Sequence, residues 1–259
     1  ATRCDCVNVI RVVYNETTPS DRSRTRRDES RAQVLRFELI DGSTVDVAVT
    51  RLFNAGYAGR DQASVRAHID ELAELGVPGP SQVPALYPVS PYLAQQADSV
   101  AVQNEKSSGE AEWAIVFTDD GVLLTAACDQ TDRDLETYGV AWSKNASPDV
   151  LAKKAWRLDD VEDHVDDIRI EAWVTDSSGS ESRIQDGTLG DLLPPAHWIR
   201  ELKDQGYARP GTVLISGTIP MAPDVDQFAP GWRVRLTDPT NDETIELSYT
   251  VEKMPEPIG

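Results

Sequence analysis

The sequence predicts an α+β protein that is mainly β. Short runs of alternating apolar and polar residues dominate the chain, which is typical of strands, and helical spacing is confined to a few segments. Strands do not alternate regularly with helices, as a doubly wound sheet requires. In the main body the expected strands cover 112–117, 122–128, 168–174, 212–216, 232–236 and 244–251, and the expected helices cover 132–138, 148–156 and 196–205.

The N-terminal third divides into an extension and a small lobe. Residues 1–31 are predicted to be a flexible extension, because the run 21–31 is polar, Arg-rich and without periodicity. The alternative for 7–14 is an extra strand. From Val34 onward two alternating runs flank Asp41-Gly42, the signature of a hairpin turn. We therefore expect a small N-terminal lobe over 32–92 and the main domain over 93–259.

Within the lobe the sequence predicts one helix, followed by a connector to the main domain. Asp61 is a suitable N-cap for a helix over 61–75, and Gly76 with Pro78 ends it. The Pro-rich stretch 77–91 fits neither a helix nor an inner strand, so we expect an extended connector.

Charge excludes several partners. The 259 residues include 44 acidic and 25 basic side chains, a net charge of -19, which disfavours nucleic acid. The 27 Asp against 6 Lys fit a protein from a halophile, whose surface works in molar salt; an ordinary acidic cytosolic protein is the alternative. With no apolar run of about 20 residues and no secretory signal, we expect a cytoplasmic protein without a membrane partner.

Two glutamates mark a candidate cation site. Glu110 and Glu112 stand at the start of a predicted strand, where period-2 geometry points both carboxylates to one face. Like charges on one face repel unless a positive charge lies between them, so the pair invites a cation. The alternative is an exposed strand face of an acidic protein.

A third carboxylate, Asp129, ends the next predicted strand. The turn at 119–121 pairs the two strands as a hairpin and would return Asp129 to the side of Glu110. Three carboxylates form an all-oxygen site that suits Mg²⁺ or Mn²⁺, and Ca²⁺ also fits. The alternative role for Asp129 is to cap the helix that begins near Asp132.

The three histidines offer one candidate base. His68 and Glu71 lie three residues apart on a predicted helix, where Glu can orient the imidazole; a surface pair is the alternative. His164 lies in the acidic run 159–167, which reads as a solvated face, and His197 reads as structural.

Five motifs in order resemble the fumarylacetoacetate hydrolase superfamily. In this sequence they are H-x-x-E at His68 to Glu71, E-x-E at Glu110 to Glu112, D-x-T-x-R-D at Asp129 to Asp134, S-K at Ser143-Lys144 and G-T-x-P at Gly217 to Pro220. Segments 54–62 and 87–93 are similar to those of a short-chain, uncharacterised branch that carries a domain of unknown function. The resemblance covers 34–254.

The resemblance implies a mixed β-roll with a divalent metal at its mouth. Glu110, Glu112 and Asp129 would be the metal ligands. His68 with Glu71 would activate a water, Lys144 would stabilise developing negative charge, and Arg133 and Thr218 would hold a substrate carboxylate or carbonyl. It also implies a homodimer. The chain departs from the pattern in two ways: only 17 positions separate Glu112 from Asp129, and no His precedes E-x-E.

The resulting functional hypothesis is a divalent-metal-dependent hydrolase of the fumarylacetoacetate hydrolase type. It would cleave a carbon-carbon bond in a small oxo or dicarbonyl carboxylic acid through a metal-stabilised enolate. A decarboxylase, hydratase or isomerase on the same substrate class would use the same enolate. A hydrolase of a cyclic amide or lactone and a non-catalytic binding protein that kept the fold are further alternatives.

Overall fold

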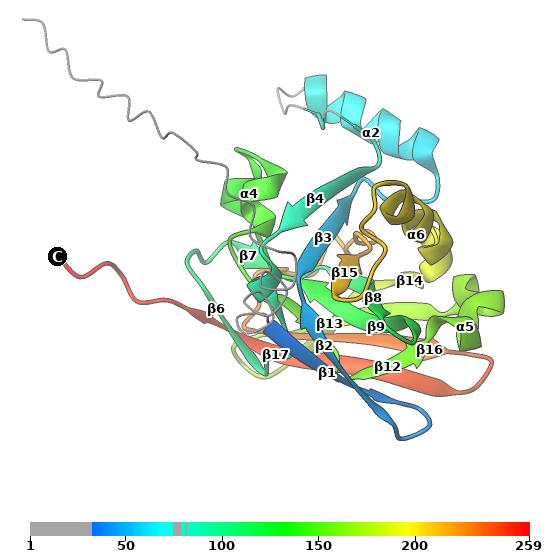
Figure 1. Ribbon diagram of the computed structural model, residues 1–259. Helices are drawn as coiled ribbons and strands as arrows, with labels where there is room; N and C mark the ends of the chain where they lie inside the picture. Colours follow the sequence, from blue (N-terminus) through cyan, green and yellow to red (C-terminus); the bar gives the residue numbers. More distant parts are fainter. Residues whose placement is uncertain (1–32, 75–78, 81) are drawn as a thin grey trace, which may run out of the picture. The chain divides into compact units, whose positions relative to one another are not determined.

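The computed structural model describes residues 33–74, 79–80 and 82–259, and the predicted extension at 1–31 lies outside this range. Within it, ten strands form the first sheet (Figure 1). Their order is β2 (Thr44–Val49), β1 (Gln33–Leu39), β12 (Lys154–Arg157), β9 (Gly121–Asp129), β8 (Ala111–Thr118), β15 (Thr212–Ile215), β3 (Arg51–Gly56) and β4 (Ala85–Val89), with β11 (Asp149–Leu151) and β5 (Ala94–Gln95) added beside β9.

A second sheet and a short pair account for the other strands of the described range. The five-stranded sheet has the order β14 (Glu181–Thr188), β13 (Arg169–Thr175), β16 (Gly231–Asp238), β17 (Glu243–Lys253) and β6 (Ser99–Val102), and β7 (Ser107–Ser108) pairs with β10 (Thr131–Asp132). The helices are α2 (Gln62–Glu74), α3 (Arg133–Glu136), α4 (Val140–Lys144), α5 (Leu158–Val161) and α6 (Pro195–Asp204), with 3-10 turns η1 (Pro91–Leu93), η2 (Glu162–Asp167) and η3 (Leu189–Asp191).

The first sheet is curled because the chain itself joins its two ends. β2 is the edge strand at one end of the order and β3 lies beside the edge strand at the other end, yet only Thr50 separates them along the chain. One residue spans about 3.4 Å in a strand, so the two ends must meet. Gly211 secures the crossing, where its carbonyl accepts from Thr50 N at 2.8 Å and from Arg51 N at 3.2 Å.

The curl separates two hydrophobic cores. The inner face of the first sheet buries side chains such as Phe37 on β1, Val116 on β8 and Val213 on β15 against one another. The outer face packs against the second sheet, where Trp113 and Ile115 lie in the same core as Trp232. Strands β8 and β9 are therefore buried on both faces, which explains their near-continuous apolar sequences.

The fold class predicted from the sequence is confirmed, and so are many of its elements. The hairpin at Asp41-Gly42 joins β1 and β2, with Gly42 at φ +79°. Asp61 caps α2, since its Oδ1 accepts from Ala63 N at 3.0 Å and Ser64 N at 3.2 Å. The six strands predicted for the main body correspond to β8, β9, β13, β15, β16 and β17.

Three predictions of secondary structure need correction. The helix predicted over 148–156 is wrong: the segment forms β11 and β12, because both pair with β9 and this pairing overrides the local helical spacing. The stretch 77–91 was expected to be a connector only, but it contains β4, which is an edge strand as its prolines require. β14 escaped prediction because its mostly exposed side chains leave little apolar alternation.

β1 to β4 share the first sheet with β8 and β9. The division into a lobe over 32–92 and a domain over 93–259 stays a prediction. Within the described residues, no helix is long and apolar enough to span a membrane.

Substitution of Gly211 will test the crossing from β2 to β3, which closes the first sheet into a roll. Gly211 has φ +82°, and a Cβ there would lie 2.6 Å from the Ala48 carbonyl oxygen. We expect Gly211→Ala to lower the free energy of unfolding by roughly 3 kcal/mol, measured by urea denaturation, because backbone strain and a clash add.

Gly42→Ala is the matched control, because Gly42 has nearly the same φ of +79° with nothing within 4 Å of the added Cβ. It should cost about 1 kcal/mol, the backbone strain alone. Equal losses in the two variants would contradict the role assigned to the close approach.

Candidate metal centre

The inner face of the roll changes from apolar to polar at one end of its strands. On β8, Glu112 continues the inward row of Ala114 and Val116, and on β9, Asp129 continues the row that contains Ala127. Side chains two residues apart lie on the same face of a strand, so both carboxylates point into the roll. Both are fully buried.

Two neighbouring strands extend this polar layer in the same way. Asn54 follows the inward-facing Leu52 on β3, and Asp149 precedes the inward-facing Leu151 on β11. Both side chains are fully buried. Neither residue was predicted from the sequence. For Asp149 the alternation with Leu151 was a usable signal, but it was hidden by the wrong helix over 148–156.

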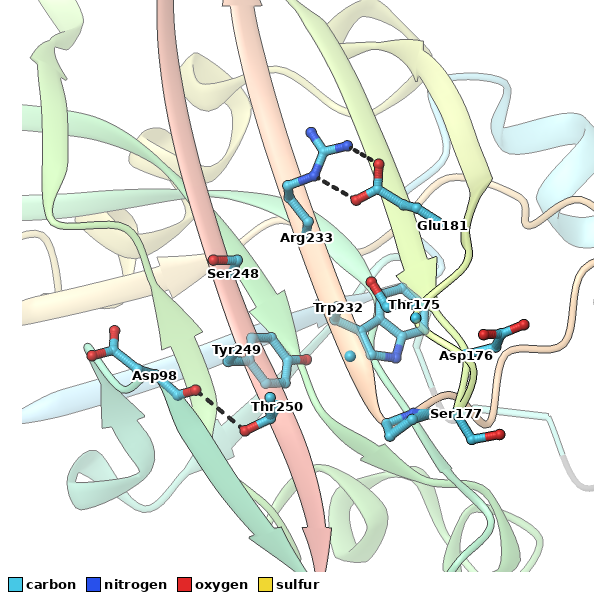
Figure 2. Close-up of a pocket in the computed structure, with 13 residues that line it drawn as sticks. Asp98, Thr175, Asp176, Ser177, Glu181, Trp232, Arg233, Ser248, Tyr249 and Thr250 are labelled. Carbon is cyan, nitrogen blue, oxygen red and sulfur yellow. Dashed lines mark hydrogen bonds and ion pairs between the residues drawn. The ribbon is translucent and has the colours of Figure 1, made fainter.

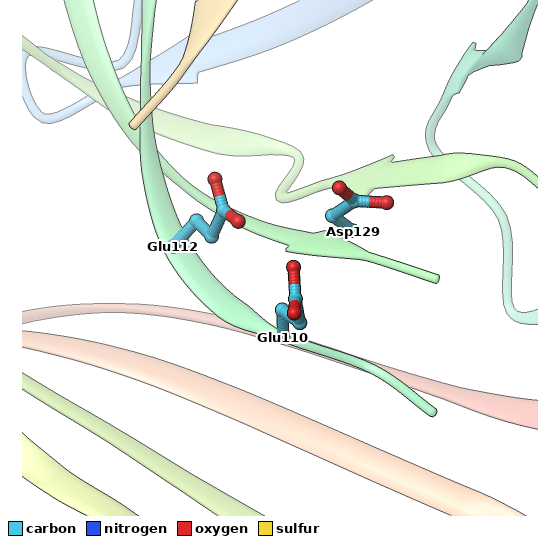
Figure 3. Close-up of side chains that lie close together, drawn as sticks. All are labelled: Glu110, Glu112 and Asp129. Atoms are coloured by element: carbon cyan, nitrogen blue, oxygen red, sulfur yellow. The ribbon is translucent and has the colours of Figure 1, made fainter. Parts of the chain in front are cut away.

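Glu110, Glu112 and Asp129 converge on one point (Figure 3). Each offers one carboxylate oxygen, and these atoms lie within 4.8 Å of one another. The hairpin returns the third carboxylate as its register predicts, because Asp129 N donates to the Glu110 carbonyl oxygen at 3.1 Å. Such a cluster requires a positive charge at its centre or beside it.

Both alternative roles, an exposed strand face for the glutamates and a helix cap for Asp129, are wrong. Glu110 is only 7% exposed and Glu112 is fully buried, so E-x-E is not a solvated strand face. Asp129 does not cap the following helix, because Asp132 does so by accepting from Asp134 N and Leu135 N. Asp129 is therefore free to act within the cluster.

Lys144 and Arg133 supply positive charge to the cluster. Lys144, at the end of α4, is 4% exposed; its Nζ lies 3.0 Å from Glu110 Oε2 and also donates to Asp129 Oδ2. Arg133 Nη1 lies 2.8 Å from Glu110 Oε1 and 3.0 Å from Glu136 Oε2. Both oxygens of Glu110 are thus engaged by cationic side chains.

The pKa values reflect this environment. Burial raises the pKa of Glu110, but the charges of Lys144 and Arg133 outweigh burial and bring the pKa to about 2. Burial likewise lowers the pKa of Lys144, but Asp129 and Glu110 outweigh it and hold the pKa well above its ordinary value. Glu110 is therefore an anion and Lys144 an ammonium at neutral pH.

Glu112 and Asp149 behave differently. Burial raises the pKa of Glu112 well above its ordinary value, against the charge of Lys144 and a 2.6 Å bond from Gly217 N to Oε2. Burial, and then the charge of Asp129, raises the pKa of Asp149 well above its ordinary value. The layer thus carries more carboxyl groups than its own cations neutralise.

The donor set fits a divalent cation. Glu112 Oε1 and Asp129 Oδ1 are buried without a hydrogen-bond partner, as are Asn54 Oδ1 and Asp149 Oδ2. Buried oxygens without partners are costly, and a hard cation satisfies them. Cys128 points to the opposite face of β9, where its Sγ accepts from Tyr249 Oη at 3.2 Å, so it offers no soft ligand.

Thr218 follows Gly217, whose backbone N donates to Glu112 Oε2. Thr218 Oγ1 donates to the Ala111 carbonyl oxygen and accepts from Gln185 Nε2, both at 2.8 Å. The predicted role of its hydroxyl in substrate binding, like that of Arg133, stays a prediction.

The predicted histidine dyad cannot be placed. His68 and Glu71 belong to α2, but their side chains lie outside the described part of the chain. His164 is not simply part of a solvated face, because its Nε2 lies 3.0 Å from Oδ2 of the buried Asp238. His197 Nδ1 lies 3.1 Å from Arg200 Nη2 on α6.

A separate hollow of about 730 Å³ opens on the second sheet (Figure 2). Gly231, Thr175 and Thr250 line it, together with Glu181 and Arg233, which form a salt bridge of 2.6 Å. None of the predicted site residues lines this hollow. Its charged groups are already paired or exposed, so the carboxylate cluster remains the candidate site.

Comparison with known families identifies the family of this chain. The model of the family described as "Protein of unknown function (DUF2848)" matches residues 55–249. The chain belongs to the DUF2848 family. The matched region includes Asn54's neighbours on β3 and every residue of the carboxylate cluster. No curated protein sequence matches this DUF2848 chain.

Solved structures share the fold of this DUF2848 protein. A hexagonal crystal form of 2-keto-3-deoxyarabinonate dehydratase has a TM-score of 0.58 at 16% identity, covering 80% of this chain and 74% of that one. A 2-keto-3-deoxy-D-arabinonate dehydratase complexed with magnesium and 2,5-dioxopentanoate has 0.57 at 15%, covering 95% and 85%. Cg1458 has 0.54 at 18%, covering 80% and 78%. The fold is the fumarylacetoacetate hydrolase-like mixed β-roll.

Removing the buried ammonium will test how the cluster is held together. We expect Lys144→Met to lower the free energy of unfolding in EDTA by about 3–5 kcal/mol, because buried carboxylates lose their counter-charge. Urea denaturation measures the loss.

Lys153→Met is the control, since Lys153 makes an exposed pair with Asp98 at 3.1 Å, with 65% and 87% of the two side chains exposed. This substitution should change the free energy of unfolding by less than about 1 kcal/mol. A comparable loss in both variants would show that Lys144 is not the counter-charge of the cluster.

Proposed function

We propose that this protein is a divalent-metal-dependent enzyme that acts on a small oxo or dicarbonyl carboxylic acid. The observation that carries the proposal is the buried cluster of Glu110, Glu112 and Asp129, whose ligand oxygens lie within 4.8 Å. Buried oxygens of Glu112 and Asp129 have no hydrogen-bond partner, and a bound cation would satisfy them. Support comes from the shared fold, since one neighbour is a dehydratase complexed with magnesium and 2,5-dioxopentanoate.

Glu110, Glu112 and Asp129 would hold the ion, and Mg²⁺ or Mn²⁺ suits three carboxylates best, with Ca²⁺ also compatible. When bound, the ion supplies positive charge beside a substrate carbonyl and so favours formation of the enolate. Glu110 would have to share an oxygen with the ion, because Arg133 and Lys144 engage both of its oxygens in this structure.

Lys144 and Arg133 suit the handling of an anionic substrate. The ammonium of Lys144 is buried and held by two carboxylates, so it is a fixed donor that stabilises negative charge on a reacting oxygen. Arg133, with 19% of its side chain exposed, can reach a substrate carboxylate from the edge of the cluster. Thr218 is proposed as a further substrate contact.

Hydrolytic cleavage of a carbon-carbon bond is the leading reaction. It consumes a water molecule, which the proposed dyad of His68 and Glu71 would activate. Dehydration is the second candidate, favoured because two of the structural neighbours are dehydratases. It releases water from the substrate, so the two reactions differ in their products.

The remaining expectations belong to the same proposal. We propose a cytoplasmic homodimer with a surface adapted to high salt. Light scattering on the purified protein measures the oligomeric state, and activity measured at low and molar salt tests the adaptation.

Loss of a ligand should weaken metal binding and turnover together. We expect calorimetry to show Mg²⁺ or Mn²⁺ binding to the parent, and Glu112→Gln and Asp129→Asn to raise the Kd about 100-fold or more. Loss of even an outer partner costs about 10- to 100-fold in affinity. Turnover of a panel of 2-oxo and 3-oxo acids should fall in parallel in these variants. Analysis of the products formed by the parent separates cleavage from dehydration.

Glu171→Gln is the matched control. Glu171 is another buried glutamate at 7% exposure, but it lies on β13 and pairs with Arg183 and Arg235. This variant should keep the metal affinity of the parent. Metal binding that survives in the Glu112 and Asp129 variants would refute the assigned ligands.

A further inference from the structure

Asn54 lies between two buried aspartates. Its Nδ2 donates to Asp129 Oδ2 at 3.0 Å and to Asp149 Oδ1 at 3.1 Å. All three side chains are fully buried. Asp129 and Asp149 are direct partners in the antiparallel ladder of β9 and β11. Asn54 comes from a third strand, β3, and is the only link that the described side chains make between the two aspartates.

The arrangement needs such a link. Acidic residues directly opposite each other in a ladder destabilise the pair, and burial increases the cost. The amide group of Asn54 has two N–H donors, and the structure uses one for each aspartate. The bonds from Asn54 and Lys144 both go to Asp129 Oδ2, which leaves Oδ1 without a partner.

The backbone of Asn54 is held firmly enough to orient its neighbours. Asn54 pairs with Ile215 of β15 on one side and with Tyr87 of β4 on the other. A side chain on a strand paired on both sides has little freedom to move, which suits a role in positioning. Asn54 also begins the segment 54–62, which resembles the uncharacterised branch of the superfamily and has no role assigned to it.

We propose that Asn54 is a positioning residue for the metal centre and that Asp149 acts through it. Asp149 accepts one N–H of Asn54 and thereby directs the other N–H to Asp129 Oδ2. Asp129 is then oriented with Oδ1 free for the cation. This inference rests on the proposed function, because it takes Asp129 to be a metal ligand.

The test measures Mg²⁺ and Mn²⁺ affinity by calorimetry and, separately, unfolding by urea in EDTA. Asn54→Leu removes both donors, and Asp149→Leu removes the acceptor. Each should raise the metal Kd about 10- to 100-fold. The double variant should be no weaker than Asn54→Leu alone, because the two residues act through one chain of bonds.

Asp149→Asn separates positioning from charge. The new amide keeps an oxygen that accepts from Asn54, so the metal Kd should stay within about threefold of the parent. A Kd raised as far as in Asp149→Leu would show that the charge of Asp149 matters instead, and would overturn its assigned role. An unchanged Kd in Asn54→Leu would overturn the proposal as a whole.

Two further variants guard the interpretation. Gln96→Leu removes an amide that also bridges two segments, donating to the carbonyl oxygens of Arg36 at 2.8 Å and Ala152 at 3.0 Å, and should leave the metal Kd unchanged. If a leucine variant does not fold, Asn54→Ser, which cannot donate to both aspartates, should raise the metal Kd about 10-fold or more, and an unchanged Kd would overturn the proposal. A parent that binds neither metal refutes the proposed function, and this inference with it, whereas normal binding in Asn54→Leu refutes only the inference.

Discussion

Burying several carboxylates in one layer of a β-roll costs free energy, which nearby positive charge or protonation of some of the carboxyl groups offsets. Here Lys144 Nζ contacts Glu110 and Asp129, and Arg133 contacts Glu110 from the other side. With Glu112 and Asp149, the layer holds four carboxyl groups against these two cations. The carboxyl groups outnumber these cations, and Arg133 also pairs with Glu136. A bound divalent ion would supply further positive charge, so the electrostatics of the fold and the proposed chemistry have the same origin.

The curl of the first sheet makes this layer. A strand has two faces, and closing the sheet turns one face of every strand inward, so that the inward rows of β3, β8, β9 and β11 end at the same level. Their apolar residues fill the roll, and their last inward positions carry Asn54, Glu112, Asp129 and Asp149. Because each of these strands is paired in a ladder, the polar groups are held by backbone hydrogen bonds rather than by mobile loops.

The net charge of -19 now divides into two parts with different roles. Many of the 44 acidic side chains face solvent, as in the exposed positions of the run 159–167. The four of the inner layer do not. An anionic substrate would approach a strongly negative protein, so Lys144, Arg133 and a bound cation would have to reverse the field locally.

The sequence by itself determined the fold class, most strands of the main body and the face to which the E-x-E pair points. It also determined that Asp129 returns to Glu110, because a hairpin sets its register through a short turn. Only the tertiary structure decided that Asn54 and Asp149 join them. Local periodicity specifies which face of a strand is buried but not which strand lies beside it, and residues 54, 129 and 149 meet only when distant segments pair. The helix wrongly predicted over 148–156 shows the same limit. Pairing with β9 outweighed the local helical spacing, and this pairing places Asp149 opposite Asp129.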